Sequence, residues 1–292
     1  MRGGPTAAVL ALLFNAFSWG LCWWPFRQLQ ALGVHPLWAT ASIYTLVAAA
    51  LLAWRPAAGA DLLRTPGLWV LLLASGFTNA SFNWGVTTGD VVRVVLLFYL
   101  MPLWTALLAR GLLREPLHAG VVLRALLAVG GALLVLRPEG GGWPLPRAWP
   151  DWLGLAGGAS FALNSVMLRR EASRPAASRA LAMFAGGALV STAVALVGAV
   201  AQPAWAVPAP WLPWVLLLAL WFMAANLSLQ FGAARLRAST TAVVMVSEVV
   251  FASVSAVALG AATLRPHTLA GGALIAAAAL MAAWQEGRRV EG

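Results

Sequence analysis

The sequence predicts an all-α membrane protein of ten transmembrane helices, arranged as two inverted five-helix repeats. Three observations lead to this fold class. Hydrophobic residues make up 61% of the 292 residues, charged residues make up only 10%, and one polar pattern occurs twice. Soluble domains carry about one quarter charged residues, whereas the apolar residues here fall in runs of the roughly 20 residues that cross a bilayer. We therefore expect the chain to lie in a membrane along most of its length.

The repeated pattern is an amide, any residue, Ser, a large apolar residue, a second amide, an aromatic residue and Gly. It reads NASFNWG over residues 79–85 and NLSLQFG over residues 226–232. Residues four apart share a helix face, so each copy presents a pair of amides, which are Asn79 with Asn83 and Asn226 with Gln230. Amides in lipid are costly unless they meet protein or water. The two pairs are therefore predicted to meet, and the alternative is a coincidence between two glycine-ended apolar segments.

Ten apolar runs define the predicted spans, which lie at about 6–26, 36–54, 67–87, 91–111, 117–136, 152–169, 178–200, 211–232, 238–260 and 267–285. The first run is predicted to be a retained helix, because it is too long and too rich in Trp for a signal peptide.

A linker rich in Pro and Gly lies near the middle of the chain, at residues 137–151. It separates a first five-helix repeat, residues 1–136, from a second, residues 152–292. Because five is odd, the second repeat enters the membrane from the opposite face, as in many secondary transporters. The letters GGAL support the repeat weakly, because they begin at Gly130 and Gly271 in matching spans but also at Gly186.

The basic residues indicate the orientation of the chain. All nineteen are Arg, and thirteen of them lie on the side that would hold both termini, against five on the other side. The positive-inside rule therefore predicts cytoplasmic termini, and the expected location is a bacterial inner membrane. The absence of Lys excludes a P-loop lysine and a pyridoxal Schiff base. The single Cys22 and three scattered histidines offer no metal site, so we expect no cofactor and no metal. Arg93 and Arg124 lie near span ends and are expected to have structural roles.

Short motifs in both halves resemble the drug/metabolite transporter superfamily, and within it the EamA-type branch. These motifs are Trp19-Gly20 before Arg27, Met101-Pro102-Leu103, the turn LREPL at 113–117, and SEVVF at 247–251. The second half has Leu259-Gly260-Ala261 where the family pattern would place a glutamate. The closest likeness within the branch is to the YddG-type exporters of aromatic amino acids. The resemblance implies a ten-helix exporter of small organic solutes, with spans 1, 3, 4, 6, 8 and 9 lining a cavity.

One carboxylate, that of Glu248, lies well inside a predicted span. Intramembrane carboxylates are costly and usually face a partner or a cavity, so Glu248 is a candidate for proton coupling or for binding a substrate ammonium. A structural hydrogen bond is the alternative. Pro102 lies near the corresponding position of the first half and is predicted to kink its helix, as a hinge or simply for packing.

Aromatic rings beside amides suit an amphipathic organic molecule. The candidate substrate-binding residues are Asn15, Trp19, Asn79, Asn83, Tyr99, Asn164, Asn226 and Gln230. Hydrogen bonding between helices is the alternative for each residue, and it is favoured for Asn15 and Asn164.

The predicted function is secondary transport that exports small organic solutes, most readily amino acids. A multidrug or organic-cation efflux carrier is the first alternative. A membrane sensor and an intramembrane serine protease built on Ser160 are more remote, and the protease lacks a histidine base at mid-span. The expected partners are a small-molecule substrate and the lipid bilayer, without nucleic acid. The oligomeric state stays open, with a monomer among the alternatives.

Overall fold

A computed structural model of the chain consists of α-helices and connections in the residues that it describes. These are residues 5–101, 103–104, 107–108, 119–135, 137, 145–201, 210–233, 244–245, 247–263 and 265–289. The helices are α1 (Pro5–Leu21), α2 (Trp23–Ala31), α3 (Pro36–Trp54), α4 (Ala57–Arg64), α5 (Pro66–Thr88), α6 (Val91–Phe98), α8 (Ala119–Val135), α9 (Trp149–Arg170), α10 (Ala176–Val197), α11 (Leu212–Ala233), α13 (Ser247–Ala258) and α14 (Pro266–Arg289).

In the part of the chain that the structure describes, four helices are long and apolar enough to cross a membrane. They lie at Thr6–Ala31, Pro36–Trp54, Ala176–Val197 and Leu212–Leu229, and α4 with α5 adds a fifth candidate if that bent pair is one span. Many leucines on the outer faces are exposed, such as Leu126 and Leu220, which suits contact with lipid. The chain is therefore described as a multi-pass membrane protein. Its ten spans and their inverted arrangement stay predictions.

Two elements differ from the sequence-based expectation. The first apolar stretch continues through α2 to Ala31, beyond its predicted end at residue 26, because only Cys22 separates α1 from α2. Helix α4 lies in a segment expected to be a connection. It buries Ala58 and Leu62, which are four residues apart, and it meets α5 at a bend of 98°. Such a short amphipathic helix has too few apolar residues to show up as a span.

Prolines mark where several helices begin. Pro36, Pro66 and Pro266 are the first residues of α3, α5 and α14. Proline suits this position because its ring fixes φ near the helical value and its missing N–H would be unbonded there. The start of α3 also has a side-chain cap, since His35 Nδ1 accepts a hydrogen bond from the Leu37 N–H at 3.2 Å.

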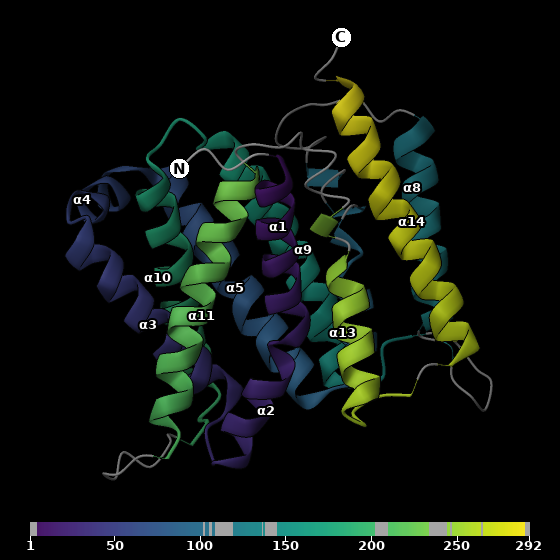
Figure 1. Cartoon of the computed structure of the whole chain (residues 1–292), viewed down its shortest axis with the longest axis horizontal. Helices are drawn as coiled ribbons and strands as arrows, with labels where there is room; N and C mark the ends of the chain where they lie inside the picture. Colours follow the sequence, from purple (N-terminus) through teal and green to yellow (C-terminus); the bar gives the residue numbers. More distant parts are fainter. Residues whose placement is uncertain are drawn as a thin grey trace.

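The helices form a main body and a peripheral pair. Within the body, α5 packs against α9 and α10, α10 against α3, α1 against α11 and α13, and α6 against α9. Helices α8 and α14 pack against each other and lie side by side at one edge of the molecule (Figure 1). The beginning of α1 and the end of α14 lie toward the same edge, at the top of Figure 1.

Glycines let two helix pairs approach closely. A Cβ on Gly131 of α8 would lie 2.6 Å from Gly271 O of α14, and a Cβ on Gly271 would lie 2.5 Å from Gly131 O. The third GGAL copy also makes contacts, since a Cβ on Gly186 of α10 would lie 2.0 Å from Leu72 O of α5. Small residues at such seams are the usual means of close helix packing in membranes. All three copies are thus packing sites.

The α8–α14 seam leads to a matched pair of variants. Gly131→Ala should lower the free energy of unfolding by about 1–3 kcal/mol, because the added methyl group forces the two backbones apart. Gly130→Ala should be neutral or stabilising by up to about 1 kcal/mol, because a Cβ there meets nothing within 4 Å. Thermal unfolding of the purified variants measures both effects. Equal melting temperatures for the two variants would contradict the close seam.

Candidate functional site

Five aromatic rings connect helices of the two predicted halves. We call them the aromatic cluster, and they are Trp19 of α1, Phe82 of α5, Phe98 of α6, Phe161 of α9 and Phe222 of α11. Trp19 stacks on Phe222 at a centroid distance of 5.0 Å and meets Phe82 edge-on at 6.2 Å. Phe98 contacts Phe82 at 4.9 Å and Phe161 at 5.4 Å. The cluster is a continuous apolar surface among five helices.

Tyr99 and Glu248 form a hydrogen-bonded pair beside this cluster. Tyr99 directly follows α6, and its hydroxyl lies 3.0 Å from Glu248 Oε2 and 3.0 Å from Met245 O. Both side chains are buried, Glu248 with 7% of its surface exposed. Glu248 lies in the first turn of α13, where the positive end of the helix dipole favours a carboxylate. The structure thus gives the Glu248 carboxylate a specific donor, from a residue 149 positions away.

Helix α1 packs tightly against α13 at this pair. A Cβ on Gly20 would lie 2.7 Å from Phe251 Cβ and 2.9 Å from Glu248 O, so a larger side chain there would push α1 away. Close by, Trp23 Nε1 donates to Ser255 Oγ at 3.0 Å. Glycine and a tryptophan hydrogen bond together hold the first helices against the carboxylate-bearing helix.

The first copy of the repeated amides faces α3. Tyr44 Oη donates to Asn79 Oδ1 at 2.5 Å, while Asn79 Nδ2 donates to Ser75 O at 2.8 Å. One turn further, Asn83 Nδ2 donates to Thr40 Oγ1 at 3.1 Å. Both amides are buried, so the apolar stretch of α3 carries the polar partners that they need. Thr40 and Tyr44 were not predicted as site residues, although their spacing of four residues in an apolar span was a signal for them.

The second copy lies on α11. Asn226 is half-buried there, one helical turn after Phe222, and the side chain of Gln230 lies outside the described residues. Tyr44 connects the first copy with α11, the helix that carries the second copy, because its hydroxyl binds Asn79 and its ring lies 6.1 Å from that of Phe222.

Three buried amide oxygens have no hydrogen-bond partner in the described part of the chain, namely Oδ1 of Asn15, Asn83 and Asn164. The orientation of two of these amides follows from chemistry. Asn15 donates to a backbone carbonyl, Ala225 O, at 2.8 Å. Asn83 donates to Thr40 Oγ1, whose own proton goes to Pro36 O at 2.8 Å. The unused atoms are therefore acceptors. Asn15 also makes the hydrogen bond between helices that its position in the sequence favours.

The remaining predicted candidates are placed as follows. Pro102, the hinge candidate, lies outside the described residues. Among the residues that the structure describes, no three His, Cys, Asp or Glu side chains form a group that could hold a metal ion. The glycines before Ser160 have a packing role, since a Cβ on Gly158 would lie 2.4 Å from Phe98 O.

Two arginines that face away from the expected cytoplasmic side bind helix ends. Arg93 Nε and Nη2 donate to Asp151 Oδ1 at 2.6 Å and Oδ2 at 2.9 Å, and Nη1 donates to Val135 O at 2.9 Å. This residue therefore joins α6, α9 and the end of α8. Arg27 donates to Thr87 O at 3.0 Å and Gly89 O at 2.7 Å, at the end of α5. Sequence reasoning expected a structural role for Arg93 but did not find its carboxylate partner.

Asp151 is nearly buried, with 4% of its side chain exposed, and its backbone partners are the N–H groups of Arg147 and Ala148. Burial raises the pKa of Asp151, but the hydrogen bonds from Arg93 and from these backbone groups lower it by more. The pKa of Asp151 therefore lies below its ordinary value.

The Tyr44–Asn79 contact leads to a double-mutant cycle. Asn79→Leu should lower the free energy of unfolding by about 1–3 kcal/mol, because the buried Tyr44 hydroxyl loses its acceptor. Tyr44→Phe combined with Asn79→Leu should lose less than the sum of the single changes, since both polar partners are then gone. Melting temperatures of the four proteins give the coupling. Additive losses would show that the two side chains do not interact.

Comparison with known proteins gives a family match and a fold match. The model of the EamA-like transporter family matches residues 6–137. No curated protein matches the chain. A solved structure titled "Crystal structure of protein" is 24% identical, covers 98% of this chain and 99% of its own, and superposes with a TM-score of 0.59. The chain thus shares a fold with a solved protein over its length and resembles a family of membrane transporters in its first half.

Proposed function

We propose that this protein is a secondary transporter that exports small organic solutes, foremost amino acids and aromatic amino acids among them, across a bacterial inner membrane. The match to EamA-like transporters over residues 6–137 supports transport, and the long apolar helices support a membrane location. The observation that carries the proposal is the Tyr99–Glu248 pair, which is buried beside rings from five helices.

The chemistry of this site suits an amine with an apolar body. The carboxylate of Glu248 would bind the ammonium group, and the rings would contact the apolar part of the solute. One O–H donates fully to one acceptor, and Tyr99 has two within 3.0 Å, Glu248 Oε2 and Met245 O. When an ammonium group or a proton occupies Glu248, the Tyr99 hydroxyl can donate to Met245 O. The Tyr99 hydroxyl then has an acceptor in either state.

The other proposed solute contacts come from both halves of the chain. Trp19 and the second-copy residues Asn226 and Gln230 would contribute from one side. The unused amide oxygens of Asn83 and Asn164 would accept further hydrogen bonds from the solute. Asn15 would act in the same way, and Pro102 remains the proposed hinge. Asn79 is proposed as a contact reached through Tyr44, because both of its polar groups already have partners.

We also propose the inverted repeat of residues 1–136 and 152–292, joined by the linker 137–151. The helix contacts support it. In the repeat, α1 corresponds to α9, α5 to α11 and α6 to α13. The contact between α1 and α11 therefore corresponds to that between α9 and α5, and the contact between α1 and α13 to that between α9 and α6. All four of these helix pairs pack. The pairs α3–α10 and α8–α14 map onto themselves and also pack. The excess of Arg on one side supports cytoplasmic termini.

An organic-cation efflux carrier is the second candidate. Within the described residues, the unpaired buried amide atoms of Asn15, Asn83 and Asn164 are acceptors, and Glu248 adds a carboxylate. Such a site favours donors and positive charge over a free carboxylate. Amines without a carboxyl group would then be better substrates than amino acids. A protease is disfavoured, because the glycines before Ser160 already serve to pack α9 against Phe98.

Counterflow in proteoliposomes tests the function and separates the two candidates. Vesicles loaded with an unlabelled solute should accumulate the same solute in labelled form, and the uptake should saturate. Phenylalanine, leucine and serine form one arm of the panel, and phenethylamine and tetraphenylphosphonium form the other. Preference for the first arm supports the amino acid exporter, and preference for the second supports the cation carrier. No saturable exchange of any member by folded protein would contradict both.

A further inference from the structure

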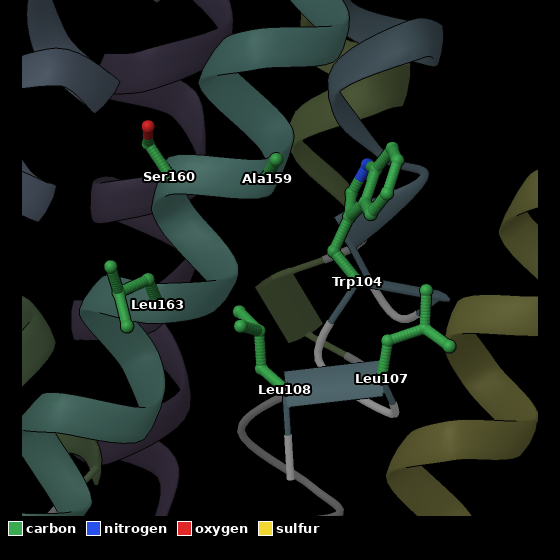
Figure 2. A pocket seen from close by; sticks show the side chains of 6 residues that line it. All are labelled: Trp104, Leu107, Leu108, Ala159, Ser160 and Leu163. Atoms are coloured by element: carbon green, nitrogen blue, oxygen red, sulfur yellow. The ribbon is translucent and has the colours of Figure 1, made fainter. Parts of the chain in front are cut away.

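A crevice lies between the chain just after α6 and helix α9, away from the Tyr99–Glu248 pair. Its volume is about 410 Å³, and it is lined by Trp104, Leu107, Leu108, Ala159, Ser160 and Leu163 (Figure 2). This volume falls in the range that holds small organic ligands. The crevice opens onto the surface of the protein, and Leu107 at its rim is half exposed. Because none of the six lining residues is charged, the opening suits the lipid phase better than water.

The indole N–H of Trp104 is an unused donor in this apolar place. Its Nε1 is buried and has no hydrogen-bond partner in the described part of the chain. Figure 2 shows the indole ring beside the crevice, with its nitrogen on the edge nearer Ala159 of α9. A buried donor without a partner is costly, so an acceptor that reached this nitrogen would stabilise the position.

The crevice borders the proposed transport site. Phe161 follows Ser160 on α9, and its ring contacts Phe98 at 5.4 Å. Phe98 in turn precedes Tyr99, the partner of Glu248. Two rings of the aromatic cluster that touch each other are thus the chain neighbours of Ser160 in the crevice and of Tyr99 in the buried pair. Rings can move aside by rotating about their side-chain bonds, whereas a backbone seam such as that at Gly158 cannot.

We propose that this crevice is a lateral access site, through which amphipathic solutes pass between the lipid phase and the Tyr99–Glu248 site. The occupant is an amine with an apolar ring and a hydrogen-bond acceptor. The ring lies between the leucines, and the acceptor binds Trp104 Nε1. The inference rests on the proposed transport function, but occupancy of the crevice is measurable without transport.

A spin label in the crevice tests occupancy. Cys22, the one cysteine of the chain, is replaced by Ala, and Leu107→Cys, at the rim of the crevice and 50% exposed in the wild type, is labelled in proteoliposomes. Collisions with oxygen should be frequent and collisions with a water-soluble nickel chelate rare, which shows access from lipid. Phenylalanine methyl ester should then lower the oxygen collision rate. The control label at Leu189→Cys, on the outer face of α10 and 57% exposed in the wild type, should not respond. An unchanged rate at position 107, or equal changes at both positions, would overturn the proposal.

A second pair of variants tests the role of the crevice in transport. Trp104→Phe should weaken the effect of phenylalanine methyl ester by roughly two- to tenfold. The same variant should leave the effect of phenethylamine on the oxygen collision rate unchanged, because that amine lacks the carbonyl acceptor. Leu163→Trp fills the crevice and should slow counterflow of both apolar amines at least about tenfold, with serine counterflow as the reference. An equal loss of serine counterflow in Leu163→Trp would overturn lateral access. If the wild-type protein transports neither serine nor the two amines, the proposed function fails, and the spin-label result alone decides whether the crevice is occupied.

Discussion

Glu248→Gln should reduce the affinity for amine solutes in counterflow by roughly 30-fold or more. Removing one member of a buried charge pair costs about 2–5 kcal/mol, and each 1.4 kcal/mol is tenfold in affinity. Glutamine keeps the shape of the side chain and an oxygen that can accept from Tyr99. The melting temperature should therefore change little, while half-saturating solute concentrations rise steeply.

The control for this prediction is Glu171→Gln. Glu171 lies outside the site, 3.8 Å from Arg174 and 4.0 Å from Arg170, so its replacement should leave the half-saturating solute concentrations unchanged. Tyr99→Phe should have an intermediate effect, because it removes a hydrogen-bond donor and keeps the carboxylate. If Glu248→Gln lowers the melting temperature and leaves the half-saturating concentrations unchanged, Glu248 is a structural residue.

Arg93→Met should lower the free energy of unfolding by about 3 kcal/mol. It removes the two guanidinium donors from the buried Asp151 carboxylate, which keeps only the backbone N–H groups of Arg147 and Ala148. An uncompensated buried charge costs about 3–5 kcal/mol. We take the lower end because a quarter of the Arg93 side chain is exposed. Arg93→Met with Asp151→Leu should recover most of the loss, because no charge is then left without a partner.

The same ion pair predicts a pH dependence. The folded-state pKa of Asp151 lies below its ordinary value, so the stabilisation is fully present above the unfolded pKa of about 3.9. It is lost as the pH falls through the folded pKa. The melting-temperature difference between wild type and Asp151→Asn should therefore be constant near neutral pH and shrink below about pH 4. Asp61→Asn is the control, since its partner Arg174 is 44% exposed. A difference that persists undiminished well below pH 3 would contradict the assignment.

The membrane location, the helices and their approximate positions could be predicted from the sequence, because these properties are local. Runs of about 20 apolar residues make spans, and prolines at 36, 66 and 266 mark helix starts. The carboxylate of Glu248 stood out for the same reason, since its cost in lipid depends on its own surroundings. Helix α4 was missed, because eight residues with two buried apolar side chains leave only a weak signal.

The partners of these groups were decided by the tertiary structure. Tyr99 and Glu248 are 149 residues apart, and nothing in either segment names the other. The amides in the first copy of the polar pattern were predicted to meet those in the second copy. In the structure, Asn79 and Asn83 form hydrogen bonds with Tyr44 and Thr40 of α3. Which groups need a partner can be read from the sequence, because the cost of a polar atom in lipid follows from the residue and its neighbours. Which partner each group receives was settled only when α5 packed beside α3 and α6 beside α13, since hydrogen bonds act over about 3 Å and helix packing sets which atoms come that close.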